Sequence, residues 1–121
     1  MRKPAKSFQD LEAWKAAHQF VMGIYKKTEE FPNEEKFGLT SQIRRAAVSI
    51  PANIAEGFSK RGKKDKCRYF NISQGSLEEC RYYLILATDL ELGDFGNLFQ
   101  ELDRTAKLLS RYMTTIQDSN S

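Results

Sequence analysis

The amino-acid sequence predicts an all-α protein, specifically an antiparallel up-down-up-down bundle of four helices. Three observations lead to this fold class. The 121 residues contain four segments in which apolar residues recur at helical spacing. The connections between these segments are short, which favours antiparallel neighbours, and no stretch alternates apolar and polar residues over the length of a strand. A chain of this length forms one domain rather than two, so residues 1–121 are assigned to a single four-helix-bundle domain.

The first helix is predicted over residues 8–30. Ser7 and Asp10 have the spacing of an N-terminal capping pair. Phe31 precedes Pro32, and the position before a proline disfavours helical backbone, so the helix ends there. Residues 1–6 are expected to be frayed. The apolar stripe of this helix consists of Leu11, Trp14, His18, Val21 and Tyr25.

The second helix is predicted over residues 39–60. Pro51 lies inside it, where it loses one backbone hydrogen bond and clashes with the carbonyl of Ala47. Because the apolar stripe continues in phase beyond the proline, we expect a kink at Pro51 rather than a break. This stripe consists of Leu39, Ile43, Ala46, Ala47, Ile50, Ile54 and Phe58.

The third helix is predicted over residues 64–92, with Gly93 as its C-terminal stop. The fourth is predicted over residues 95–117, capped either by Asp94 or by Asn97 with Gln100, and residues 118–121 are expected to be frayed. The stripe of the fourth helix consists of Phe95, Leu98, Leu102, Leu109, Tyr112 and Ile116.

The third helix has more apolar surface than a helix that is buried on one side only. Its apolar arc spans roughly 200° on a helical wheel. Phe20 in the first helix and Val48 in the second also fall outside their stripes. A central helix in a monomer would explain such an arc, but a four-helix bundle has no central helix, so we favour a contact between subunits. The predicted interface residues are Tyr69, Ile72, Tyr82, Tyr83, Ile85 and Leu86.

A basic run connects the second and third predicted helices. It comprises Lys60, Arg61, Lys63, Lys64, Lys66 and Arg68, and only Asp65 opposes it. In an up-down bundle this turn lies at the same end as both termini, where Arg2, Lys3 and Lys6 join it. The opposite end carries Glu29, Glu30, Glu34, Glu35, Glu91 and Asp94. The modest net charge of +3 therefore conceals a dipolar molecule.

Several of these cations occupy the N-terminal turns of the third helix, where the helix macrodipole disfavours positive charge by typically about 0.3–1 kcal/mol. We interpret them as a surface for the phosphates of nucleic acid, with Tyr69 and Phe70 near enough to stack on bases, although core packing is the favoured role of Phe70. The alternative is a solvated loop that keeps a monomer soluble. Arg44 and Arg45 are interpreted as partners of glutamates on another helix or another subunit.

The sequence contains no recognisable pattern of catalytic or metal-binding residues. His18 lies on an apolar stripe, which favours a position in the interior or at an interface. Glu-x-x-His pairs, clustered zinc ligands and a glycine-rich phosphate loop are all missing. Cys67 and Cys80 lie about 20 Å apart along one helix, too far to form a disulfide. We therefore predict no catalysis, metal or cofactor and, without a signal peptide or membrane span, a cytoplasmic location.

Several stretches together resemble one protein family. The segment from Leu39 to Gly57, the start from Phe8 to Trp14, Phe31-Pro32, and residues 75–79 resemble the bacterial four-helix-bundle proteins encoded by intervening sequences of large-subunit ribosomal RNA genes. The resemblance covers about residues 7–117 and implies an up-down bundle that assembles as a ring-like homopentamer. A more distant resemblance is to the accessory variability determinant of diversity-generating retroelements, a basic pentameric bundle that binds nucleic acid and a reverse transcriptase.

These patterns predict a non-enzymatic homo-oligomer that binds RNA or DNA non-specifically through a basic rim. The alternative is a scaffold that docks a partner protein without contacting nucleic acid. An enzyme with an unrecognised site at the subunit interface is the third and least favoured hypothesis. No membrane contact is expected.

Overall fold

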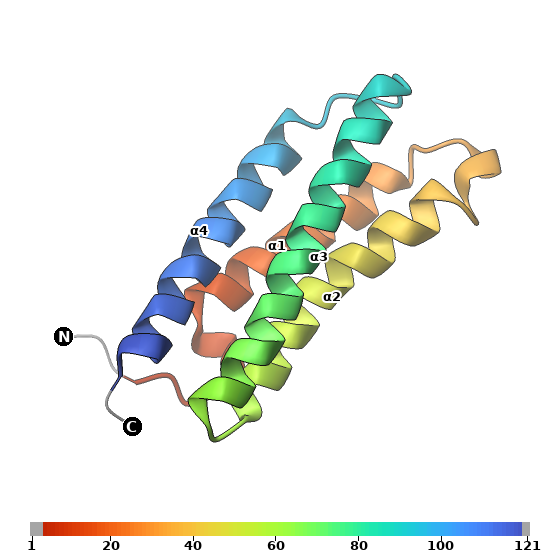
Figure 1. The fold of residues 1–121 in the computed structure, drawn as a ribbon. Helices are drawn as coiled ribbons and strands as arrows, with labels where there is room; N and C mark the ends of the chain where they lie inside the picture. Colours follow the sequence, from red (N-terminus) through yellow and green to blue (C-terminus); the bar gives the residue numbers. More distant parts are fainter. Residues whose placement is uncertain (1–3, 120–121) are drawn as a thin grey trace.

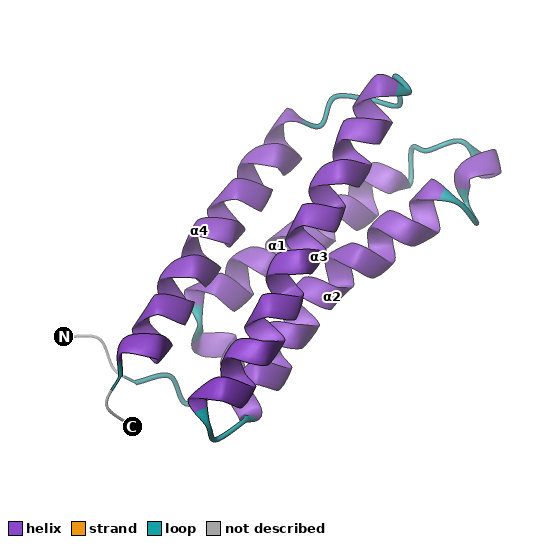
Figure 2. Cartoon of the chain, in the orientation of Figure 1, coloured by secondary structure: helices purple, strands orange, loops and turns teal. Residues whose placement is uncertain are grey.

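A computed structural model describes residues 4–119, and all regular structure in them is helical (Figure 1, Figure 2). The four α-helices are α1 (Glu12–Thr28), α2 (Leu39–Ser59), α3 (Lys63–Asp89) and α4 (Gly96–Asp118). Two short 3-10 turns, η1 (Phe8–Asp10) and η2 (Asn33–Glu35), precede α1 and α2. The predicted all-α class with four helices is confirmed, and the described residues form no strand.

Each helix packs against two neighbours: α1 and α3 both contact α2 and α4, whereas the diagonal pairs do not meet. Figure 1 shows the α1–α2 and α3–α4 connections at one end of the molecule and the α2–α3 connection at the other. Phe31, after α1, packs its ring against Phe95, before α4, with 5.9 Å between ring centroids. This arrangement places α1's last turn beside α4's first.

The core lies between the four helices. Its largest fully buried side chains are Phe20, Phe70, Ile24, Ile43, Ile50, Ile54, Leu77, Leu84, Leu102, Leu109, Thr105 and Cys80. The stripe predicted for α2 is buried except for Phe58, which is half-buried. Helix α2 runs continuously through Pro51, and the kink there stays a prediction.

The stripe predicted for the first helix is only partly correct: Leu11 and Val21 are buried, and Trp14 packs against the core. Phe20, taken to lie outside it, is fully buried, whereas His18 and Tyr25 are exposed. The inner face of α1 combines three alanines, among them Ala13 and Ala17, with larger side chains such as Phe20 and Ile24. A stripe traced through the largest side chains misses such a face. Phe20 therefore contributes nothing to the surplus of apolar surface, while Val48 does lie exposed.

Two predicted helix ends also need correction. Ser7 and Asp10 do form a reciprocal capping box, but it caps the 3-10 turn η1; Leu11 is extended, so α1 begins at Glu12 instead of residue 8. Helix α3 ends at Asp89, before the predicted residue 92. Its stop is a Schellman motif, in which the N–H groups of residues 91 and 92 donate to the carbonyls of residues 88 and 87.

The left-handed position of this motif is occupied by Glu91, with φ 59°, while the predicted stop, Gly93, lies two residues beyond it. The N-cap residue of α4 is Phe95, whose side chain makes no capping hydrogen bond, so neither Asp94 nor Asn97 is the predicted cap. Asp94 lies one residue before the N-cap and accepts a hydrogen bond from the Gly96 N–H at 3.0 Å.

The predicted frayed tails are only partly open to comparison, because residues 1–3 and 120–121 lie outside the described part of the chain. Ala5 packs against the core, and the Lys6 N–H donates to Asp10 Oδ2 at 2.8 Å, so the described part of the N-terminal tail is docked. Asp118 is the last residue of α4. Arg2 and Lys3, predicted to join the basic run, also lie outside the described residues.

Candidate functional site

The six predicted cations gather at one end of the bundle, called here the basic end: Lys60, Arg61, Lys63, Lys64, Lys66 and Arg68. Lys60 is the C-terminal cap residue of α2, and Gly62 is the N-cap of α3, so a very short turn holds the cations together. The structure separates them into cations that are held by the chain itself and cations that point only to solvent.

Lys66 belongs to the first group. Its Nζ donates to the carbonyl of Phe58 at 2.8 Å and lies 5.4 Å from the centre of the Phe58 ring. This carbonyl belongs to the last turn of α2, whose carbonyls have no partner within the helix, so Lys66 acts as a side-chain cap. Partial burial lowers the pKa of the Lys66 ammonium.

Two further cations of the basic end, Lys60 and Arg68, contact the ring of Tyr69. The Lys60 ammonium lies 5.2 Å from the centre of that ring and 3.7 Å from the Glu56 carboxylate. The Arg68 guanidinium lies 4.8 Å from the same ring and donates to the Tyr69 hydroxyl. Lys63 Nζ donates to the Ser119 carbonyl, just beyond α4. Phe70 is fully buried with its ring against Tyr112, so a role in stacking on bases is wrong for this residue.

The second group consists of Arg61 and Lys64. Both are exposed, and within residues 4–119 neither side chain takes part in a hydrogen bond, an ion pair or a ring contact. An exposed charge without an internal partner contributes little to the fold, and it is free to meet an external anion.

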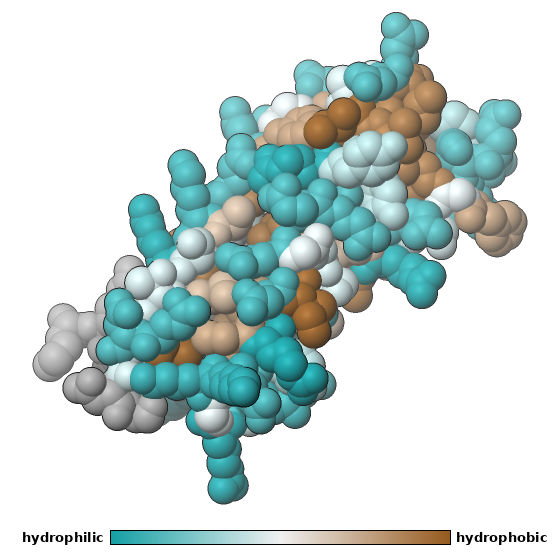
Figure 3. Space-filling view, in the orientation of Figure 1, coloured by the Kyte–Doolittle hydropathy of each residue, from teal (hydrophilic) through white to brown (hydrophobic). Residues whose placement is uncertain are grey.

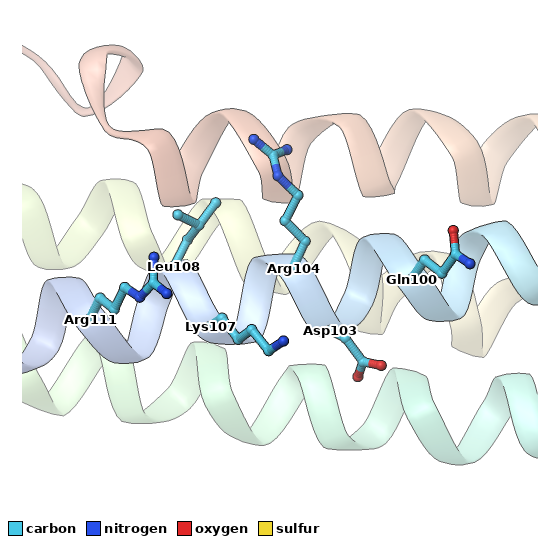
Figure 4. Close-up of a pocket in the computed structure, with 6 residues that line it drawn as sticks. All are labelled: Gln100, Asp103, Arg104, Lys107, Leu108 and Arg111. Atoms are coloured by element: carbon cyan, nitrogen blue, oxygen red, sulfur yellow. The ribbon is translucent and has the colours of Figure 1, made fainter.

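Sequence reasoning missed three further cations of the same kind on α4. Arg104, Lys107 and Arg111 are exposed, and their charged groups have no partner in the described chain. They line a shallow open groove of about 410 Å³ together with Gln100, Asp103 and Leu108 (Figure 4). Their spacing of three and four residues places them along one face of the helix. That spacing is visible in the sequence, although the denser run of cations at residues 60–68 is the more prominent pattern.

The opposite end of the molecule carries the predicted acidic residues and two arginines. Arg44 Nε donates to Thr28 Oγ1 at 2.8 Å, and its guanidinium lies 4.6 Å from the centre of the Tyr25 ring. The prediction that Arg44 pairs with a glutamate on another helix is therefore wrong within the chain: a hydroxyl, the Tyr25 carbonyl and an aromatic ring hold it instead. Arg45 is exposed and has no partner among the described residues.

The predicted interface residues fall into two sets. Ile72, Tyr82 and Ile85 are exposed by 45%, 58% and 45%, so half of the predicted set is available to a partner. Tyr69, Tyr83 and Leu86 are half-buried. Leu86 and Tyr83 pack against the core of their own chain, and the Tyr83 hydroxyl donates to Glu79 at 3.1 Å.

The titratable side chains show no assembled reactive centre. His18 is exposed and stacks on Trp14, with 5.0 Å between ring centroids, so an interior position for it is wrong. Both cysteines are free; Cys67 is half-buried, and burial raises the pKa of the Cys80 thiol to about 12. Among residues 4–119, no three His, Cys, Asp or Glu side chains are grouped so that they would hold a metal ion. None of the helices there combines the length and apolar character that crossing a membrane requires.

Comparison with known proteins adds one finding. Residues 9–113, most of the chain, match the family model described as 23S rRNA-intervening sequence protein. No curated protein matches the chain.

Proposed function

Because the chain belongs to the family of 23S rRNA-intervening sequence proteins, we propose that it is a non-enzymatic, cytoplasmic homo-oligomer that binds RNA or DNA through its basic end. One observation carries the proposal: Arg61, Lys64, Arg104, Lys107 and Arg111 present charge to solvent with no anionic partner in the described chain. Phosphates are the anions that such a surface meets repeatedly along one polymer.

The proposed contact is with the nucleic-acid backbone. Backbone phosphates attract cations without regard to sequence, whereas base recognition needs side chains that reach base edges. Lys60 and Arg68 already contact the Tyr69 ring, so that ring is not open to a base. Contacts with phosphates are therefore favoured over base stacking. Binding is therefore expected to tolerate changes of sequence and to weaken steeply as salt rises.

Assembly into a ring would strengthen this binding. The contacts between consecutive helices support an up-down-up-down order, and a kink at Pro51 would fit α2 to its neighbours; both belong to the proposal. The exposed apolar side chains of α3 support self-association, and the resemblance to the family gives five as the expected number of subunits. Several basic ends on one particle would hold one strand at several points, which raises the overall affinity.

The test is binding of labelled mixed-sequence RNA and duplex DNA, measured by fluorescence anisotropy over a range of salt concentrations. A plot of the logarithm of the association constant against the logarithm of the salt concentration is expected to be linear. Its slope should be roughly −0.9 for each phosphate neutralised on a duplex and about −0.7 for each on a single strand. The double variant Arg61→Glu/Lys64→Glu is expected to bind at least tenfold more weakly, because it removes two phosphate contacts and adds two repulsive charges.

One matched pair of variants separates the effect of location from the effect of net charge. Lys64→Glu and Lys26→Glu each change the net charge equally, and both side chains are exposed without a partner in the described chain. Only Lys64→Glu, at the basic end, is expected to weaken binding. Lys63 and Lys66 are left unchanged because they contact carbonyls of their own chain. Absence of binding at low salt, or normal binding by the double variant, would exclude the nucleic-acid function.

A protein-docking scaffold is the second candidate function, and one observation favours it. Phe37, at the end opposite the basic end, is 88% exposed, and only the Lys36 ammonium stands over its ring. A large apolar side chain in solvent is more useful in a protein contact than in binding phosphate. If the wild-type protein binds neither RNA nor DNA, this scaffold function leads.

A further inference from the structure

Six of the eight large exposed apolar side chains of the described chain fall into two separate groups, and Met22 and Ile72 belong to neither. One, the α3 face, comprises Tyr82, Ile85 and Leu90 near the C-terminal end of α3, with the acidic residues Glu79 and Asp89 beside them. The other, the α1/α2 groove, is an open depression of about 490 Å³ whose lining includes Tyr25, Lys36, Phe37, Arg44, Arg45 and Val48. Figure 3 shows apolar surface gathered toward the end of the molecule where α3 ends.

The two surfaces have opposite charge. Lys36, Arg44 and Arg45 line the groove, and none has an acidic partner within residues 4–119. Glu79 and Asp89, which flank the α3 face, likewise take part in no ion pair there. Like charges would repel if two α3 faces met each other. A contact between an α3 face and a groove brings opposite charges together around an apolar centre.

The two surfaces also lie at the same height along the bundle. Ser49 of α2 and Ser76 of α3 are level with each other, because their hydroxyls are joined by a 2.8 Å hydrogen bond. Arg45 lies four residues before Ser49, and Glu79 three residues after Ser76. Because the helices run in opposite directions, Arg45 lies about 6 Å and Glu79 about 4.5 Å from that level, in the same direction. The contact of Arg44 with Tyr25 places the α1 wall of the groove at this height too.

Equal height decides what kind of assembly the two surfaces allow. A contact between two different surfaces of one chain is heterologous, and it either closes into a ring or continues as a filament. When both surfaces lie at one height, a rotation about an axis parallel to the bundle carries each copy onto the next without a rise, so a closed ring is allowed.

We propose that the α3 face of one copy occupies the α1/α2 groove of the next copy. Arg44 is held in place by Thr28 and stacked on Tyr25, so it presents a fixed positive wall to the incoming helix. Arg45 also lines the groove and is exposed, at nearly the same height as Glu79. This inference rests on the homo-oligomer in the proposed function and adds which surfaces join.

The experiment uses one disrupting substitution in each surface. Ile85→Glu places a charge in the α3 face, and Val48→Glu places one in the groove; these side chains are 45% and 41% exposed, so neither change disturbs the core. Ile85→Glu keeps only an intact groove, and Val48→Glu keeps only an intact α3 face, so neither variant can bind a copy of itself. Each alone is expected to be a monomer of about 13.9 kDa by light scattering. Mixed in equal amounts, the two variants are expected to form a pair of twice that mass, because the groove of one accepts the α3 face of the other.

The matched control is the double variant Ile85→Glu/Val48→Glu, which is expected to remain monomeric when mixed with either single variant. If the two single variants do not pair on mixing, or if Val48→Glu alone still assembles, the inference is overturned, since α3 faces would then join each other or another surface would be used. A monomeric wild-type protein would overturn this inference and the proposed homo-oligomer together. An oligomeric wild type whose variants fail to pair overturns the inference alone and leaves nucleic-acid binding untouched.

Discussion

Gly57 is the residue at which one added methyl group is expected to damage the fold most. It is buried in the last turns of α2, where α3 crosses closely. A Cβ atom at this position would lie 2.5 Å from Phe70 Cε1, 2.9 Å from Phe70 Cδ1 and 3.1 Å from the Lys66 carbonyl oxygen. Gly57→Ala therefore forces either the Phe70 ring or the backbone of α3 to move.

The size of the effect follows from these distances. Carbon atoms pack at about 3.5–4.0 Å, so the ring must retreat by about 1 Å or more. Phe70 is fully buried, and the Tyr112 ring, with its centroid 5.3 Å away, resists that retreat. Overpacking of this kind costs about 1–3 kcal/mol, and alanine returns up to about 1 kcal/mol through its higher helix propensity. The net expectation is a loss of about 1–2 kcal/mol, or a fall in Tm of about 4–8 °C for a domain of this size.

Gly75→Ala is the matched comparison. Gly75 lies within α3, and apart from its chain neighbours and the adjacent helix backbone, no atom of the described chain would lie within 4 Å of an added Cβ. Only helix propensity then changes, so Gly75→Ala is expected to stabilise the helix by about 0.5–1 kcal/mol. Both variants are made in the Ile85→Glu chain to keep subunit contacts out of the comparison. Thermal and urea unfolding are followed by circular dichroism at 222 nm. A Gly57→Ala protein that melts at or above the parent temperature would refute the close approach of α2 and Phe70.

Three further predictions use other sites. Among the described residues, Glu101 Oε2 is buried without a hydrogen-bond partner, and burial raises the pKa of the carboxyl above its ordinary value of 4.5. The protonated Glu101 therefore stabilises the fold, and this stability is lost as pH rises through the raised pKa. Glu101→Gln should raise Tm at pH 7 and lose that advantage toward pH 4. Because burial raises the pKa of the Cys80 thiol to about 12, a thiol reagent should modify only Cys67 in the folded chain and both cysteines after unfolding, and a folded Cys67→Ser variant that still reacts would contradict this. Pro51→Ala should fold yet assemble less well; an unchanged mass by light scattering with an unchanged Tm would show that Pro51 has no role in shaping α2.

Apolar periodicity predicted the number of helices and most of the core because those features depend on side-chain pattern alone. The stripe of α2 is correct for this reason, since its large branched residues mark the buried face. The stripe of α1 is only partly correct because alanines make up part of its inner face, and a stripe traced through large side chains then included the exposed His18 and Tyr25. The end of α3 failed because its left-handed residue is Glu91, whereas sequence reasoning expects glycine there.

The candidate site was predicted less completely than the fold. A run of charge is visible in the sequence, but the partners that each cation finds in the folded chain are not. Lys66 reaches a carbonyl eight residues earlier, and Lys63 reaches one at the far end of the chain. Helical spacing places Arg104, Lys107 and Arg111 on one face of α4. Whether that face is exposed depends on which side of α4 the bundle buries.

These contacts change the electrostatic argument for the basic end. If only the N-terminus of α3 is considered, the interaction of these cations with the helix macrodipole is unfavourable. The folded chain places the C-terminal carbonyls of α2 and of the residue after α4 at the same end, where they accept hydrogen bonds from Lys66 and Lys63. These hydrogen bonds place Lys63 and Lys66 beside the negative C-terminal ends of α4 and α2, so both lysines stabilise the fold without any external anion. Around the basic end, the cations that the fold does not use are Arg61 and Lys64 at the turn, and on α4 they are Arg104, Lys107 and Arg111. A phosphate backbone that binds this protein is therefore expected to cross from the α2–α3 turn toward α4.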